Sequence, residues 1–292
     1  MFMIIGILMV FGAVLGGFLM EKGPVMVLMQ PSEFLIIGGA AIGTLLAANP
    51  VHVLKRIANS FGKVLKGSGY SKQSYVEVLR MMFQLFNKAR KAGLVGIESD
   101  VEEPEKSPVF AKCPGFLTNH HARDFVCDTM RTAITGGASP YDVDQMMELD
   151  MDVHHASSVL PASSLMTVAD SLPGLGIVAA VLGVVVTMSA LGGPPEEIGH
   201  KVAAALVGTF LGILLCYGMV GPIAANLTKV VDEEHAYYHV LRVVILSFLK
   251  GMSPTLAVEA GRRAVPEHIR PTFKEVEQAC RQKDPVTETA AA

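Results

Sequence analysis

Four apolar runs constrain the fold of this 292-residue chain more than any other feature. They cover residues 1–20, 34–54, 171–191 and 202–227. A membrane-spanning helix needs about 20 predominantly apolar residues, a length that the two later runs reach. None of the runs has a carboxylate in its middle, although membrane proteins that carry ions normally keep an ionisable group inside the bilayer. We therefore expect another chain to supply any titrating group.

The composition agrees with an integral membrane protein. Apolar residues make up 51% of the chain, and the mean hydropathy is +0.43. The net charge of -3 gives no basic footprint for nucleic acid. The first run lacks the basic segment and the small-residue cleavage site of a signal peptide, so we expect it to remain as a span.

The distribution of basic residues predicts the orientation in the membrane. Lysine and arginine follow the second and the fourth runs, whereas the connection 192–200 contains Glu196 and Glu197 and no Lys or Arg. Loops rich in Lys and Arg stay on the cytoplasmic side. Both termini and the long middle segment are therefore predicted to be cytoplasmic.

The sequence thus predicts an all-α integral membrane protein with four spans in two hairpins. The expected parts are a hairpin at 1–54, a helical cytoplasmic domain at 55–167, a second hairpin at 168–227, and a cytoplasmic helix with a disordered tail at 228–292. In the middle segment, apolar residues recur at helical spacing up to Gly93, a residue suited to ending a helix. Ser139 followed by Pro140 and Asp142 predicts the start of another helix.

Small residues recur at four-residue spacing in every span, which lets helix backbones approach closely in lipid. Either packing within one subunit or association between subunits would use them, and their abundance favours a homo-oligomer as well. The pairs are Gly12 and Gly16, Gly39 and Gly43, Ala179 and Gly183, and Gly208 and Gly212.

Two prolines and one threonine stand out inside the later runs. Pro173 would lie in the first turn of a helix that starts near Asp170, where its missing N–H costs nothing. Pro222 follows many helical residues and should bend its span. Thr209 could donate a hydrogen bond back to the carbonyl of Ala205, as membrane threonines commonly do.

The sequence offers no support for an enzyme or a metal site. The adjacent histidine pairs at 120–121 and 154–155 lack metal-ligand spacing, and no phosphate-binding loop or nucleophile elbow is present. A basic cluster near Arg90 precedes an acidic cluster that begins at Glu98. The pattern alone favours a solvated charged face, with a contact surface of mixed sign as the alternative.

Two stretches carry a resemblance to a known family. The sequence DSLPGLGIVAAVLGVV from Asp170 and the sequence VGTFLGILLCYGMVGP from Val207 resemble the paired membrane motifs of MotA-type stator subunits of the bacterial flagellar motor. These motifs are specific to the MotA/ExbB/TolQ superfamily, and the order of four spans favours the MotA type. The resemblance covers nearly the whole chain.

The resemblance implies roles for six residues. Pro173 and Pro222 match the prolines that are thought to couple ion passage to a conformational change, and Thr209 matches a hydroxyl beside the ion path. Ala180 stands where sodium-driven relatives have a threonine, which favours protons as the transported ion. Arg90 and Glu98 match the cytoplasmic charges of the family that engage the rotor protein FliG.

The resemblance also implies partners. MotA-type subunits are thought to surround two copies of MotB as a ring of five in the inner membrane, with MotB supplying the essential aspartate. No bound cofactor is implied. Two alternatives stay open from the sequence: an ExbB/TolQ-type energiser of an outer-membrane process, and a passive membrane scaffold.

Overall fold

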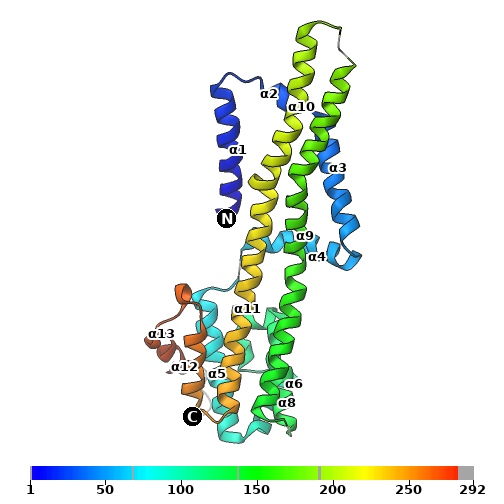
Figure 1. Ribbon diagram of the computed structural model, residues 1–292. Helices are drawn as coiled ribbons and strands as arrows, with labels where there is room; N and C mark the ends of the chain where they lie inside the picture. The colour runs from blue at the N-terminus through cyan, green and yellow to red at the C-terminus, as the bar shows by residue number, and fades with distance from the viewer. Residues whose placement is uncertain (1, 68, 137, 190–191, 282–292) are drawn as a thin grey trace. The chain divides into compact units, whose positions relative to one another are not determined.

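The computed structural model describes residues 2–67, 69–136, 138–189 and 192–281, and within these ranges all regular structure is helical (Figure 1). Four helical segments of this part are long and apolar enough to cross a membrane: Phe2–Met20, Val25–Ala48, Pro140–Met188 and Pro195–Leu249. The all-α membrane class expected from the sequence is therefore confirmed. The expected disorder at the end of the tail lies outside the described residues.

The chain divides into two compact units. The first unit combines Met1–Gly67 with Ser158–Val231, and the second combines Ser68–Ser157 with Asp232–Ala292. Helices α9 (Pro140–Met188) and α11 (Gly221–Leu249) each contribute residues to both units.

The first unit contains the apolar segments. Besides its part of α9, it holds α1 (Phe2–Met20), α2 (Val25–Leu28), α3 (Pro31–Ala48), α4 (Val51–Lys66), α10 (Pro195–Leu215), a π-helical turn at Cys216–Val220 and the start of α11. Helix α1 has no buried residue, whereas α3, α9 and α10 share a core. That core includes Ile37, Ala41, Leu172, Ala179 and Leu211.

The second apolar run does not form one continuous helix to residue 54. Helix α3 ends at Ala48, and α4 begins at Val51. Asn49 is extended, with φ -129° and ψ 135°, because the residue before Pro50 is disfavoured in the helical region. The Asn49 side chain donates a hydrogen bond to the Leu45 carbonyl (2.9 Å) and accepts one from the Ser164 hydroxyl (2.5 Å). These contacts fix the break against α9.

The second unit packs α5 (Lys72–Ala92), α8 (His120–Thr135), α12 (Pro254–Ala264) and α13 (Phe273–Arg281) with the remaining parts of α9 and α11. Its shorter elements are η1 (Leu94–Ile97), α6 (Glu98–Glu102), η2 (Phe110–Lys112), α7 (Pro114–Thr118) and η4 (Glu267–Ile269). Tyr75, Leu79, Phe86 and Tyr238 are fully buried in its core.

The expected boundaries in the middle segment are confirmed at two places. Helix α5 ends at Ala92, and Gly93 follows with a φ of 77°, which is accessible to glycine at little cost. Helix α9 begins at Pro140, where the Ser139 hydroxyl accepts a hydrogen bond from the Asp142 amide (3.2 Å). The Asp142 carboxylate in turn accepts one from the Ser139 amide (2.9 Å), which completes a reciprocal cap.

Candidate functional site

A backbone-to-backbone crossing of α9 and α10 forms the centre of the candidate site. A Cβ atom added to Gly176 would lie 2.8 Å from the Gly208 carbonyl oxygen, and one added to Gly212 would lie 2.5 Å from the Leu172 carbonyl oxygen. Farther along, a Cβ on Gly183 would lie 2.6 Å from the Ala205 Cβ. Only small residues allow two helices to approach this closely.

The four pairs of small residues therefore have different surroundings. The pairs in the two later spans lie at the α9–α10 crossing and serve packing within the subunit. At Gly12, Gly16, Gly39 and Gly43, a Cβ atom would meet nothing within 4 Å in the described part of the chain. These four glycines leave open surface on α1 and α3.

The structure places Thr209 and Ala180 next to this crossing. Thr209 follows Gly208 on α10, Ala180 follows Ala179 on α9, and both residues are half-buried. Within the described residues the Thr209 hydroxyl donates no hydrogen bond, so the expected bond to the Ala205 carbonyl is absent. Thr187 by contrast donates to the Gly183 carbonyl (2.8 Å). The Thr209 oxygen thus remains available to a ligand or a partner.

Pro173 lies inside a long helix and not at the start of one. Helix α9 is continuous over 49 residues and contains both Pro161 and Pro173, so the expected helix start near Asp170 is wrong. A proline inside a helix removes one intrahelical hydrogen bond and crowds the carbonyl four residues earlier. At Pro173 that carbonyl belongs to Ala169, which is buried in the core of the first unit.

Pro222 follows the π-helical turn Cys216–Val220, which separates α10 from α11. The Gly221 amide donates its hydrogen bond to the Cys216 carbonyl, five residues earlier. Single π-helical turns inside α-helices are frequently found at functional sites. The helix is therefore locally widened just before Pro222, whereas the bend expected at this proline stays a prediction.

Sequence reasoning missed Glu33, a buried carboxylate in the second span. Residues 31–33, which lie between the first two apolar runs, form the first turn of α3, because Pro31 occupies the first helical position. Glu33 is only 5% exposed, and its Oε2 atom lies against Gly208. The apolar segments of this chain therefore do include a carboxylate. The available signal was the spacing of Glu33, Ile37 and Ala41, which places all three on one helix face.

The charge clusters of the second unit separate into paired and exposed groups. Lys88 pairs with the buried Asp100 (2.7 Å), which also accepts a hydrogen bond from the Ser107 hydroxyl (2.7 Å). Arg90, near the end of α5, and Glu98, at the start of α6, are both exposed. Among the described ion pairs, none uses either residue. These two charges are therefore free to meet a partner.

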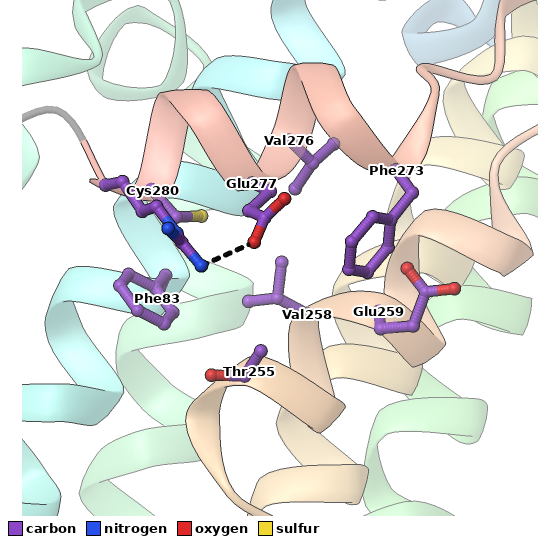
Figure 2. A pocket seen from close by; sticks show the side chains of 9 residues that line it. Phe83, Thr255, Val258, Glu259, Phe273, Val276, Glu277 and Cys280 are labelled. Carbon is purple, nitrogen blue, oxygen red and sulfur yellow. Dashed lines mark ion pairs between the residues drawn. The ribbon is translucent and has the colours of Figure 1, made fainter.

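A pocket of about 160 Å³ in the second unit is lined by residues of α5, α12 and α13, and none of the candidate residues predicted from the sequence is among them (Figure 2). Its lining is mainly apolar, and its charged groups are already paired: Arg281 with Glu277 (2.7 Å), and Glu259 with Arg262 (2.7 Å). Burial raises the pKa of the Cys280 thiol to about 11, which makes it a poor nucleophile at neutral pH. The pocket supplies no evident chemistry.

Comparison with known sequences identifies the class of protein. Residues 4–93 match the family described as motility protein A N-terminal, and residues 118–239 match the MotA/TolQ/ExbB proton channel family. The chain is thus a membrane subunit of this proton channel class, which agrees with its four apolar segments and the glycine crossing.

Full-length relatives narrow the assignment. The chain is 37% identical to motility protein A of Salmonella typhimurium over 281 residues, which cover 96% of this chain and 95% of the relative. It is also 37% identical to motility protein A of Escherichia coli, with 99% and 98% covered. A solved structure titled as C. jejuni MotAB shares the fold, with a TM-score of 0.77, 19% identity, and 93% of this chain and 98% of the other covered.

The chain belongs to the motility protein A family and is a stator subunit of the flagellar motor. Members of this family are ion-channel components and not enzymes. The full-length identity to motility protein A favours this function over the ExbB/TolQ-type energiser and over the passive scaffold.

Proposed function

We propose that the chain forms a proton-conducting complex with MotB and converts proton flow into torque on the rotor protein FliG. The observation that carries this proposal is the α9–α10 crossing, where the unpaired Thr209 hydroxyl and Ala180 adjoin the closest helix contact. The partnership is supported by the solved structure of C. jejuni MotAB, whose fold this chain shares. In this mechanism, protons load the MotB aspartate next to Thr209 and Ala180.

Several copies of the chain surround MotB in this proposal, as five subunits around two. The open glycines of α1 and α3 support association, since four small residues face no other part of the described chain. Helix α1 supports it too, because none of its residues is buried within the subunit. The complex lies in the inner membrane with both termini cytoplasmic, as the placement of Lys and Arg predicts.

Pro173 and Pro222 couple ion passage to movement of the ring in this mechanism. Each proline lies in a helical stretch that lacks a regular hydrogen bond, so each is a point at which a helix bends at low cost. Helices α9 and α11 continue into the second unit, which carries Arg90 and Glu98. These two exposed charges then contact opposite charges on FliG.

Ala180 favours protons over sodium as the transported ion. A sodium site needs several oxygen ligands to replace water, and alanine offers no side-chain oxygen beside the single hydroxyl of Thr209. We expect cells that depend on this chain to swim equally well with and without sodium. Swimming that stops when sodium is removed would contradict the choice of proton.

The stator function is tested first by deleting the gene and counting filaments by electron microscopy on the same cells. Paralysed cells with normal filaments are expected. Normal swimming in the absence of any second stator gene would contradict the function. Complementation with Arg90→Glu should then give weak rotation that a compensating charge reversal in FliG restores.

The coupling role of Pro173 has a matched control in Pro161, which is also an interior proline of α9. We expect Pro173→Ala to abolish rotation of tethered cells while MotB still co-purifies, and Pro161→Ala to retain rotation. Because both substitutions restore a helical N–H, a general stiffening of α9 would affect both variants. Rotation in Pro173→Ala cells would refute the coupling role.

A further inference from the structure

The buried carboxyl group of Glu33 is an unusual feature of the first unit. Glu33 lies in the first turn of α3 and is 5% exposed, and its Oε2 atom has no hydrogen-bond partner among the described residues. Burying such a group without a partner is costly, so it persists only where the position needs it. The neighbouring residues Phe34 and Leu35 are exposed, so the apolar side chains and not the carboxyl face outward.

The surroundings of Glu33 connect it to the α9–α10 crossing. A Cβ atom on Gly208 would collide with Glu33 Oε2, and it would also lie 3.0 Å from the Ala179 Cβ and 3.2 Å from the Ala180 amide nitrogen. The carboxyl therefore occupies the space that the missing side chain of Gly208 leaves. It reaches this space from α3 and lies beside Gly208, the residue that precedes Thr209.

Among the described residues, no other titratable group lies close to Glu33 along the helices that pack against it. On α10 the nearest one before Gly208 is Lys201, about 10 Å away along the helix axis, and Lys201 pairs with Glu197 (3.1 Å). On α9 the nearest is Asp170, about 14 Å along the axis from Ala179. Helix α2 contains only apolar residues. The protonation of Glu33 is thus free to respond to a proton or a charge that arrives from outside the chain.

We propose that Glu33 is a proton-exchanging residue of the ion path, an inference that rests on the stator function proposed above. Its carboxylate takes a proton from water on the side of the α9–α10 connection, and an O–H bond forms at the carboxyl. That bond then breaks as the proton passes to a carboxylate of the partner chain beside Thr209. Each step moves one proton between two carboxyl groups or water, so no oxidant or reductant is needed.

The test uses Glu33→Gln and Glu33→Asp in cells that deletion of the gene paralyses. Gln keeps the size and polarity of the side chain but cannot exchange a proton, whereas Asp can. Glu196→Gln is the matched control, because it makes the same chemical change at an exposed residue in the first turn of α10. Rotation of tethered cells is measured at external pH 6 to 8, with membrane level and MotB co-purification measured in parallel.

We expect Glu33→Gln to lower rotation speed threefold or more at unchanged membrane level, and Glu196→Gln to match the wild type. Glu33→Asp should rotate with a displaced dependence on external pH, which a purely structural role would not give. A smaller loss in Glu33→Gln would overturn the proposal for Glu33 and leave the stator function standing. If Glu33→Gln fails to accumulate, a pH profile of Glu33→Asp that superimposes on the wild type overturns the proposal. Swimming that survives deletion would instead overturn the stator function, and this role with it.

Discussion

The tight contact at Gly212 leads to a specific prediction about stability. In Gly212→Ala, the new Cβ would lie 2.5 Å from the Leu172 carbonyl oxygen, 2.9 Å from the Gly176 Cα and 3.2 Å from the Gly176 amide nitrogen. Non-bonded carbon contacts are comfortable at about 3.5 Å, so the helices must separate by about 1 Å. All three neighbours are backbone atoms, so no side-chain rotation can relieve the overlap.

Overpacking of this kind costs about 2 kcal/mol, which is about thirtyfold in the ratio of folded to unfolded protein. A change of that size should lower the melting temperature by roughly 4–8 °C for a protein of this size. The same separation would widen the site between Ala180 and Thr209, so we expect motility to fall as well.

Gly174→Ala provides the matched control. It introduces the same methyl group into α9, but its Cβ meets nothing within 4 Å. Alanine is the better helix former by about 1 kcal/mol in water, so this variant should be at least as stable as the wild type. The assay is thermal unfolding of the purified full-length protein in micelles, followed by far-UV circular dichroism. Equal melting temperatures for the two variants would refute the argument from the backbone contact.

Two further predictions concern the second unit. Lys88→Ala should destabilise the protein by about 1–3 kcal/mol, because it leaves the buried Asp100 carboxylate with the Ser107 hydroxyl alone, whereas Arg90→Ala should change stability by less than about 0.5 kcal/mol. Equal unfolding midpoints for these variants would contradict the division between paired and exposed charges. The hydrogen bond from Arg262 lowers the pKa of Glu259 to about 2 from its usual value of 4.5. Because the folded pKa is the lower one, this stabilisation, at most about 3 kcal/mol, is complete above pH 4.5 and is lost as the pH falls toward 2. The melting temperature should therefore fall more steeply between pH 6 and pH 3 for the wild type than for Glu259→Gln. Equal decreases in the two proteins would count against this contribution of Glu259.

The sequence predicted those features that depend on local patterns. The lengths of the apolar runs predicted the spans. Gly93 predicted the end of α5, and Ser139 with Pro140 predicted the start of α9, because helix caps depend on a few adjacent residues. Pro173 was misplaced because a proline is compatible with a first turn as well as with the interior of a long helix, and only packing decides between them.

The candidate site was predicted only in part. The positions of Thr209 and Ala180 followed from the resemblance, but their place beside a glycine crossing depends on contacts between residues more than 20 positions apart. Glu33 was missed because a lone carboxylate at the edge of an apolar run is normally solvated. Its burial requires the gap at Gly208, which no local pattern reveals.

The π-helical turn before Pro222 changes the directions in which the side chains of the last span point. A π turn holds one residue more than an α turn, so the side chains after it are rotated by about 100° relative to those before it. A face defined on α10 by Gly208 and Gly212 therefore does not continue onto α11 at the same spacing. Removing one residue within Cys216–Val220 would bring the two halves into phase, and every side chain from Pro222 onward would then point in a different direction. The wide turn thus rotates the side chains after it by a fixed angle, so the helices before and after it can present different faces to their neighbours.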